Sequence, residues 1–219
     1  MKKLILIIAC IACTMTAGAQ RARSTTSSFF STERSDAPIR FGITAGVNFA
    51  NMSYDVNGVS VSPDSRTGFN VGLTVDIPLI ESIYIKTGLG YTVKGSKLEV
   101  GNYEEKSSPA YLELPILASY RYDFSDAAQL QFNVGPYLAY GIGGKVKVTD
   151  GSDEDEEDFF GDDSDTKRFD AGLHIGAGIT VAQHYYLGVA YQWGWVNINE
   201  DSDLTVKNKN FMINLGYIF

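Results

Sequence analysis

The chain has 219 residues, with 18 basic residues against 26 acidic ones and a net charge of −8. This length suits one domain. Nucleic-acid binding needs a basic stripe, so the acidic balance argues against a nucleic-acid partner. Gly, with 22 residues, recurs inside strand-like segments, although strands of soluble proteins are depleted in it.

The N-terminus has the pattern of a secretory signal peptide. A basic Met1–Lys3 is followed by an apolar run, Leu4–Thr16, and then by Ala17-Gly18-Ala19. A retained anchor is the alternative, but a spanning helix needs about 20 apolar residues and this run is shorter. We therefore predict a signal peptide over residues 1–19, cleaved after Ala19.

Both cysteines, Cys10 and Cys13, lie within this segment. A lipoprotein signal at Cys10 is the alternative, but the apolar run before it is very short. Without residues 1–19, 16 basic residues face 26 acidic ones, a net charge of −10, and no Cys remains to form a disulfide. Residues 20–39 are rich in Ser, Thr and Arg, which predicts a flexible periplasmic leader.

From residue 40 to 219 apolar and polar residues alternate with a period of two, which is the strand period. Eight segments follow this pattern: Phe41–Phe49, Phe69–Ile77, Ile83–Lys94, Leu112–Tyr122, Leu130–Tyr140, Phe169–Val181, Tyr185–Trp195 and Phe211–Phe219. They approach the length of a tilted membrane-spanning strand, about 9–11 residues, and exceed the usual soluble strand of about 5–6.

The connections alternate strictly between short and long. The short ones are Pro78–Ser82, Asp123–Ala128 and Ala182–His184; the long ones are Asn51–Thr67, Gly95–Ala110, Gly141–Arg168 and Val196–Lys209. An outer-membrane barrel has short periplasmic turns and long extracellular loops. The sequence therefore predicts an all-β fold, an eight-stranded antiparallel up-and-down transmembrane β-barrel over residues 40–219, in the bacterial outer membrane.

The composition of the two strand faces favours this barrel over a soluble one. The polar face is rich in Gly, which suits the crowded interior of an eight-stranded barrel. Aromatic residues gather near strand ends on the apolar face, as in the girdles at the two membrane interfaces. These residues are Phe41, Phe69, Tyr91, Tyr120, Tyr122, Tyr140, Phe169, Tyr185, Trp193, Trp195, Tyr217 and Phe219.

The sequence also resembles a known family. Tyr111–Leu117, reading Tyr-Leu-Glu-Leu-Pro-Ile-Leu, with Ser119–Tyr122, Gly135-Pro136-Tyr137 and Gly42–Asn48, resembles the PorT-like outer-membrane β-barrel family of Bacteroidetes. The resemblance covers residues 40–219. It implies an outer-membrane barrel, with an accessory role in a secretion apparatus as an alternative function. The final aromatic, Phe219, partly matches the usual assembly signal, because Asn214 stands where Gly is common.

Six charged residues occupy the inward-facing pattern: Asp76, Lys86, Lys94, Glu113, Arg121 and Asp170. Strand direction places the first two and Arg121 near the periplasmic end, and the other three near the outer rim. Buried charges need partners, so we predict a structural charge network that fills the lumen. A narrow ion path is the alternative, although eight strands leave little open channel.

The sequence has two histidines, His174 and His184. His174 faces the lumen without an evident Ser partner, and His184 lies in a turn, so we predict no catalytic site, no enzyme and no cofactor.

Residues 150–165 are strongly acidic, which predicts a mobile solvated loop. Within it, Asp153, Asp155, Glu157, Asp162 and Asp163 are a weak candidate for Ca²⁺ bridging to lipopolysaccharide, and Phe159-Phe160 for a protein contact.

Together these features predict a monomeric structural or interaction barrel embedded in outer-membrane lipid. Its long loops would contact an extracellular protein partner, or its periplasmic end would contact a periplasmic protein partner. A channel for a small solute is the alternative.

Overall fold

The computed structural model describes residues 35, 37–56, 59–61, 63–101, 103–125, 127–151, 153–161, 166–200 and 204–219. The expected signal peptide and most of the expected leader lie outside these residues. In the described ranges no helix is long and apolar enough to cross a membrane.

The regular secondary structure of the described residues is β-strand, and the ring strands lie where the two-residue periodicity predicts them. The strands are β1 (Arg40–Val56), β2 (Val59–Val61), β3 (Asp64–Ile80), β4 (Ile83–Val93), β5 (Ser96–Val100), β6 (Tyr103–Ser125), β7 (Ala128–Asp150), β8 (Asp153–Asp158), β9 (Phe169–Val181), β10 (Tyr185–Gly194) and β11 (Leu204–Ile218).

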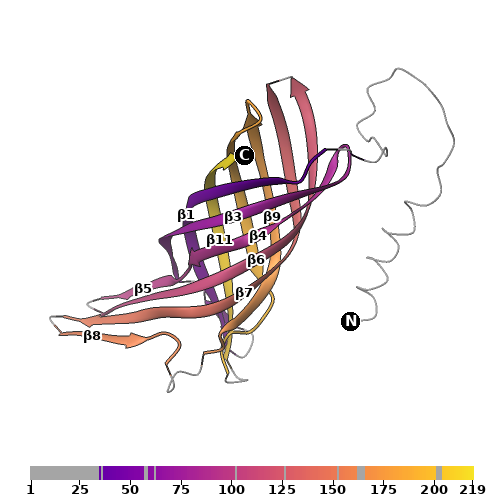
Figure 1. Ribbon diagram of the computed structural model, residues 1–219. Coiled ribbons are helices and arrows are strands. Elements are labelled where there is room, and N and C mark those ends of the chain that lie inside the picture. The colour runs from indigo at the N-terminus through magenta and orange to yellow at the C-terminus, as the bar shows by residue number, and fades with distance from the viewer. Residues whose placement is uncertain are drawn as a thin grey trace, which may run out of the picture.

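Eight of these strands close into a ring (Figure 1). Each pairs antiparallel with the next in the order β1, β3, β4, β6, β7, β9, β10 and β11, and β11 returns to β1. Ile43 of β1, for example, lies opposite Leu73 on one side and Tyr217 on the other. The predicted eight-stranded up-and-down order is confirmed.

The two faces of the ring differ as the sequence predicts. Apolar side chains such as Phe41, Leu73 and Leu215 point outward and are exposed, whereas Asn48, Ser119 and Gln131 point inward and are fully buried. A Cβ at Gly172 would lie 2.0 Å from the carbonyl oxygen of Trp193, so this inward position accepts only Gly. A polar interior inside an apolar outer belt is the reverse of a soluble barrel.

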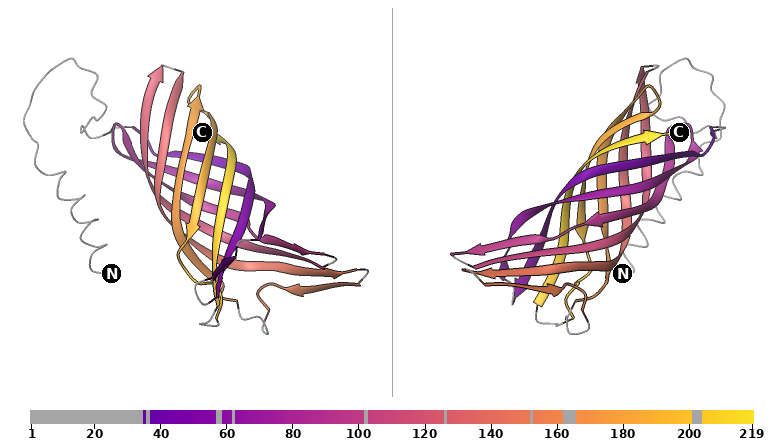
Figure 2. Two further views of the ribbon diagram at one scale, coloured as in Figure 1. Left: turned by 180° about the vertical axis from the view of Figure 1, so that it is seen from behind. Right: turned by 60° about the vertical axis from the view of Figure 1, so that its left-hand side comes forward.

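The long loops depart from the prediction, because strands continue far into them. β6 and β7 each run for 23 residues and leave the ring after a register shift at Ala110/Tyr111. Beyond that point β5 pairs with β6 and β8 pairs with β7. We call β5, β8 and these outer parts of β6 and β7 the arm; it projects from the barrel in both further views (Figure 2).

The two ends of the barrel are therefore unlike. The end that carries the connections β3–β4, β6–β7 and β9–β10 is called the short-turn end, and the end that carries the arm is called the long-loop end. The C-terminus lies at the short-turn end (Figure 1).

Candidate functional site

The six predicted lumen charges are all buried, and the structure places them in two triads. At the short-turn end, Asp76 lies between two bases. Its carboxylate is 3.3 Å from Lys86 Nζ and 2.5 Å from Arg121 Nη2. The guanidinium of Arg121 also stacks on Tyr84, with Cζ 3.9 Å from the ring centre. This base–acid–base triad carries one excess positive charge.

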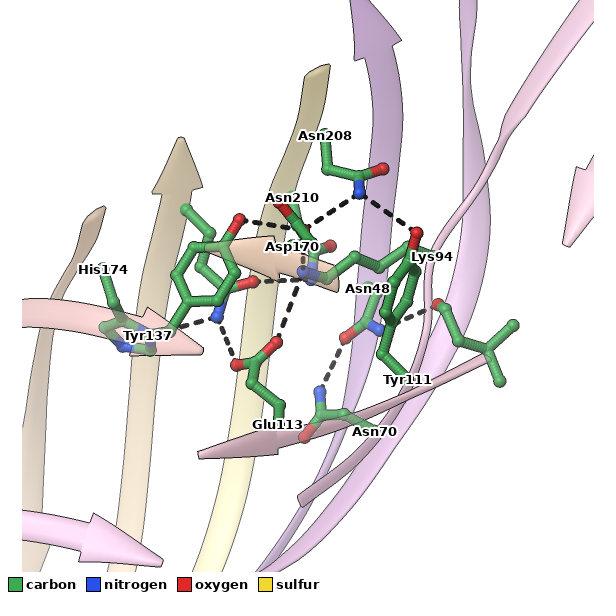
Figure 3. Close-up of polar contacts among 12 residues, drawn as sticks. Asn48, Asn70, Lys94, Tyr111, Glu113, Tyr137, Asp170, His174, Asn208 and Asn210 are labelled. Carbon is green, nitrogen blue, oxygen red and sulfur yellow. Dashed lines mark hydrogen bonds and ion pairs between the residues drawn. The ribbon is translucent and has the colours of Figure 1, made fainter. Parts of the chain in front are cut away.

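The second triad, nearer the long-loop end, has the opposite composition. Lys94 Nζ lies 3.3 Å from Glu113 Oε2 and 3.4 Å from Asp170 Oδ2, so one base is shared by two acids (Figure 3). The ammonium also lies 4.4 Å from the ring centre of Tyr137 and 5.2 Å from that of Tyr111, within range of cation–π attraction. This acid–base–acid triad carries one excess negative charge.

Neutral donors surround the second triad. Asp170 Oδ2 accepts hydrogen bonds from Tyr137 Oη at 3.2 Å and from Asn208 Nδ2 at 3.0 Å, and Glu113 accepts one from Gln192. Asn210 in turn donates to Gln192 at 3.4 Å. Sequence reasoning missed these residues as site residues. Asn208 and Asn210 precede the predicted last strand, and only their spacing of two was a usable signal.

Side chains fill the lumen at the level of each triad, but a small cavity of about 100 Å³ lies between the two triads. Lys86 from one triad and Glu113 from the other line it, together with His174 and Tyr186. His174 Nδ1 lies 3.3 Å from Gln192 Nε2 (Figure 3). His184 lies away from this cavity, at the short-turn end of the barrel. Its Nδ1 lies 2.7 Å from Ile218 O, and its ring stacks on Tyr217.

An aromatic cap closes the lumen at the long-loop end. Phe159 and Phe160 are buried with Met52, Tyr111, Tyr137, Ala139, Ile198 and Val206 in one cluster. Phe160 meets Tyr111 edge-on at 5.7 Å, and Arg168 holds its carbonyl oxygen through Nη2 at 2.6 Å. The expectation that Phe159-Phe160 would anchor a separate protein is wrong, because both rings are buried in this cluster at the mouth of the barrel.

The acidic segment is also more ordered than predicted. Asp153–Asp158 form β8 rather than a mobile loop, because lysines of β7 neutralise one of its faces. Lys145 pairs with Glu156 and Lys147 with Glu154. The face of the arm that carries these ion pairs is called the outer face. On the same face, hydrogen bonding to the Lys106 ammonium is the main cause that lowers the pKa of Glu104 to about 2.

The opposite, inner face of the arm has a different character. By register it carries Glu105, Asp150, Asp153, Asp155 and Glu157 beside Leu98, Tyr103, Val146 and Val148. No Lys or Arg shares this face within the described residues. No group of three or more His, Cys, Asp or Glu in the described part is placed to hold a metal, and Asp162 and Asp163 of the Ca²⁺ candidate lie outside it.

A closed strand ring with an exposed apolar belt and a buried polar interior defines an integral membrane barrel. The sequence profile of the family described as outer membrane protein beta-barrel domain matches residues 19–199. The chain therefore belongs to this family of bacterial outer-membrane proteins.

Solved structures of similar fold have low sequence identity. Ail, the attachment invasion locus protein of Yersinia pestis, is 15% identical over 86% of this chain and 100% of its own, with a TM-score of 0.42. Neisserial surface protein A is 13% identical over 81% of this chain and 96% of its own, with a TM-score of 0.42. The outer membrane enzyme PagL is 13% identical over 77% of this chain and 97% of its own, with a TM-score of 0.39. No curated protein matches significantly in sequence.

Proposed function

We propose that this protein is a non-enzymatic interaction barrel that uses its lumen for stability and its arm to contact a partner outside the cell. The observation that carries the proposal is the continuity of β6 and β7, whose 23-residue strands run from the ring into the arm. A paired sheet anchored in a closed barrel presents a surface in a fixed position, which a free loop does not.

The inner face of the arm indicates the kind of partner. Its carboxylates have no basic neighbour on that face among the described residues, whereas the outer-face carboxylates Glu99, Glu104, Glu154 and Glu156 pair with lysines. Opposite charge favours encounter and register between two surfaces. The proposed partner therefore presents basic groups to the inner face.

Site-specific photo-crosslinking in intact cells tests this proposal. A crosslinker at Val148, on the inner face, is expected to give one discrete product that is lost in the variant Glu105→Gln/Asp155→Asn/Glu157→Gln. The control variant Glu99→Gln/Glu104→Gln removes carboxylates of the outer face but leaves the ion pairs of β8 with Lys145 and Lys147 intact, and it is expected to keep the product. Absence of any product at Val148, or its equal loss in both variants, would sink the proposal.

A transport role is the second candidate, and the cavity of about 100 Å³ between the two triads is the observation that favours it. Steady single-channel steps in planar bilayers would support a narrow channel. A third candidate, an accessory barrel of a secretion apparatus, rests on the resemblance to the PorT-like family of Bacteroidetes. Pull-down of the tagged protein with components of such an apparatus would support it.

The proposal includes a monomer in outer-membrane lipid, exported by the signal peptide over residues 1–19, with the leader and the short turns in the periplasm. Protease added to intact cells is expected to cleave the arm and to spare the β6–β7 turn. Cleavage at that turn instead would reverse the orientation.

A further inference from the structure

β8 is an edge strand of the arm. It pairs with β7 along Lys145–Asp150, and no other described strand pairs with it. The side chains of Asp153–Asp158 are all exposed. An edge strand presents a row of main-chain N–H and C=O groups with which a further strand can pair. The arm therefore has an open side along β8, beyond the ring of the barrel.

The pairing with β7 shows which main-chain groups of β8 are free. Phe159 N donates to Gly144 O at 2.9 Å, so Asp158 beside it belongs to a non-hydrogen-bonded pair. Hydrogen-bonded and non-hydrogen-bonded pairs alternate along an antiparallel ladder. The N–H and C=O groups of Glu154, Glu156 and Asp158 therefore point away from β7.

This row of main-chain groups is open and held in place. Asp158 O accepts a hydrogen bond from Gly161 N at 3.3 Å, and the other groups of the row have no partner among the described residues. The turn at Gly151 precedes the strand, and the buried rings of Phe159 and Phe160 follow it directly. Because both ends of β8 are fixed, little freedom is lost when another strand pairs with it.

The side chains of β8 determine the charge of a strand that fits there. On the outer face, Glu154 and Glu156 already pair with lysines of β7. On the inner face, Asp153, Asp155 and Glu157 have no Lys or Arg beside them among the described residues. Cross-strand pairs of opposite charge stabilise a sheet, and pairs of like charge destabilise it. A second copy of β8 is therefore disfavoured, whereas a strand with a basic residue at every second position is favoured.

We propose that the free edge of β8 binds an extended basic peptide segment as an added antiparallel strand. The proposal rests on the interaction function proposed above and specifies how the partner binds. The main chain of the partner pairs with Glu154 and Glu156, and its basic side chains lie beside Asp153, Asp155 and Glu157. In strand addition the main-chain hydrogen bonds supply affinity, and the alternate side chains supply specificity.

A synthetic peptide tests the proposal. Fluorescently labelled Thr-Lys-Thr-Lys-Thr-Lys-Thr, with both ends blocked, is titrated with the purified full chain in dodecyl maltoside at low ionic strength. In the proposed register each Lys lies opposite an inner-face carboxylate, and the N–H groups of the Thr residues point toward β8. N-methylation of the two inner Thr residues is expected to weaken the affinity about tenfold, because two main-chain hydrogen bonds are lost. N-methylation of two Lys residues, whose N–H groups point away from β8, is the matched control and is expected to leave the affinity unchanged.

Two variants of the chain test the location of the site. Asp155→Asn/Glu157→Gln removes inner-face charge from β8 and is expected to weaken the affinity about fivefold, because two favourable cross-strand pairs are lost. Glu99→Gln/Glu104→Gln removes the same charge from β5 and β6, which β7 separates from β8, and is expected to bind like the native chain. Heat-modifiable migration on a gel confirms that each variant is folded.

Amide exchange followed by NMR gives a second measurement. The bound peptide is expected to slow exchange at Glu154 and Glu156, whereas Asp155 and Glu157, whose N–H groups point toward β7, change little. Equal affinity of the two methylated peptides would overturn strand addition, but it would leave the basic partner to the crosslinking experiment, which does not depend on main-chain pairing. No saturable binding of the parent peptide, or equal weakening in both variants of the chain, would also overturn the proposal.

Discussion

Gly141 shows how a single residue holds the aromatic cap in place. A Cβ there would lie 2.2 Å from the Phe160 ring, and the ring is held on its other side by Tyr111. We predict that Gly141→Ala displaces Phe160 and lowers the free energy of unfolding by about 1–3 kcal/mol, the usual cost of overpacking. Urea unfolding in detergent measures this.

Gly143 provides the matched control on the same strand, because a Cβ there meets nothing within 4 Å. Gly143→Ala is expected to unfold like the native chain. Equal stability of the two variants would mean that the cap does not rest on Gly141.

Glu113 is the residue through which the Lys94 triad can be tested. Its carboxylate binds both Lys94 and the amide of Gln192, so Glu113→Ala removes an acceptor of the buried Gln192 amide and leaves Lys94 with Asp170 alone. We predict a loss of about 1–3 kcal/mol of stability, the cost of leaving a buried donor without its acceptor. Thermal melting in detergent checks it; Glu154→Ala, which breaks an exposed pair on the arm, is expected to melt like the native chain.

The lumen charges were predictable one by one, but their partners were not. Asp76, Lys86 and Arg121 could be placed at one height because strand direction and a period of two fix where each inward side chain lies. Asn208 and Tyr111 could not, because each precedes its predicted strand. The stretch before Phe211 reads as polar loop, and it is held as strand by its pairing with β1.

At the scale of elements, the eight ring strands follow from local alternation, whereas β8 does not. The run Asp153–Asp158 has no apolar residue and poor strand propensity, so sequence reasoning predicts a loop. The strand forms because the acidic residues meet Lys145 and Lys147 across the sheet. That compensation is a property of the pairing register, which the acidic segment itself does not encode.

This dependence makes the β7–β8 pairing sensitive to pH. Hydrogen bonding to Lys145 lowers the pKa of Glu156, and hydrogen bonding to Glu156 and Glu154 raises the pKa of Lys145 and Lys147. A lowered carboxyl pKa stabilises the paired state above the ordinary Glu value of about 4.3, and this is lost as the pH falls through the lowered value. A raised Lys pKa stabilises the paired state below the ordinary Lys value of about 10.4. This stabilisation is lost as the pH rises through the raised value.

We therefore predict that β8 is best protected from about pH 5 to 10 and that protection declines below about pH 4. Amide hydrogen exchange of residues 153–158, corrected for the intrinsic rate, measures this. The variant Lys145→Gln/Lys147→Gln is expected to show weaker protection that changes little with pH. Equal protection of the native arm at pH 3 and pH 7 would show that the ion pairs do not hold β8.

For the whole molecule, fold and membrane environment follow from the same alternation, because an apolar outer face requires lipid and a closed ring satisfies the strand hydrogen bonds there. The arm and the cap need tertiary information, since both join segments far apart in the chain. Their consequence is a barrel closed at three heights: the Asp76 triad, the Lys94 triad and the Phe160 cap.

Closure at several heights predicts the electrical behaviour of the whole barrel. Removing one closure leaves the others, so both the native chain and Phe160→Ala are expected to be silent in planar bilayers at neutral pH. Each triad fills a narrow lumen with paired charges, and eight strands leave little space around them. A general porin inserted into the same bilayer is the positive control for reconstitution. Steady steps from the native chain would favour the channel candidate, and steps from Phe160→Ala alone would show that the aromatic cap, rather than the two triads, seals the lumen.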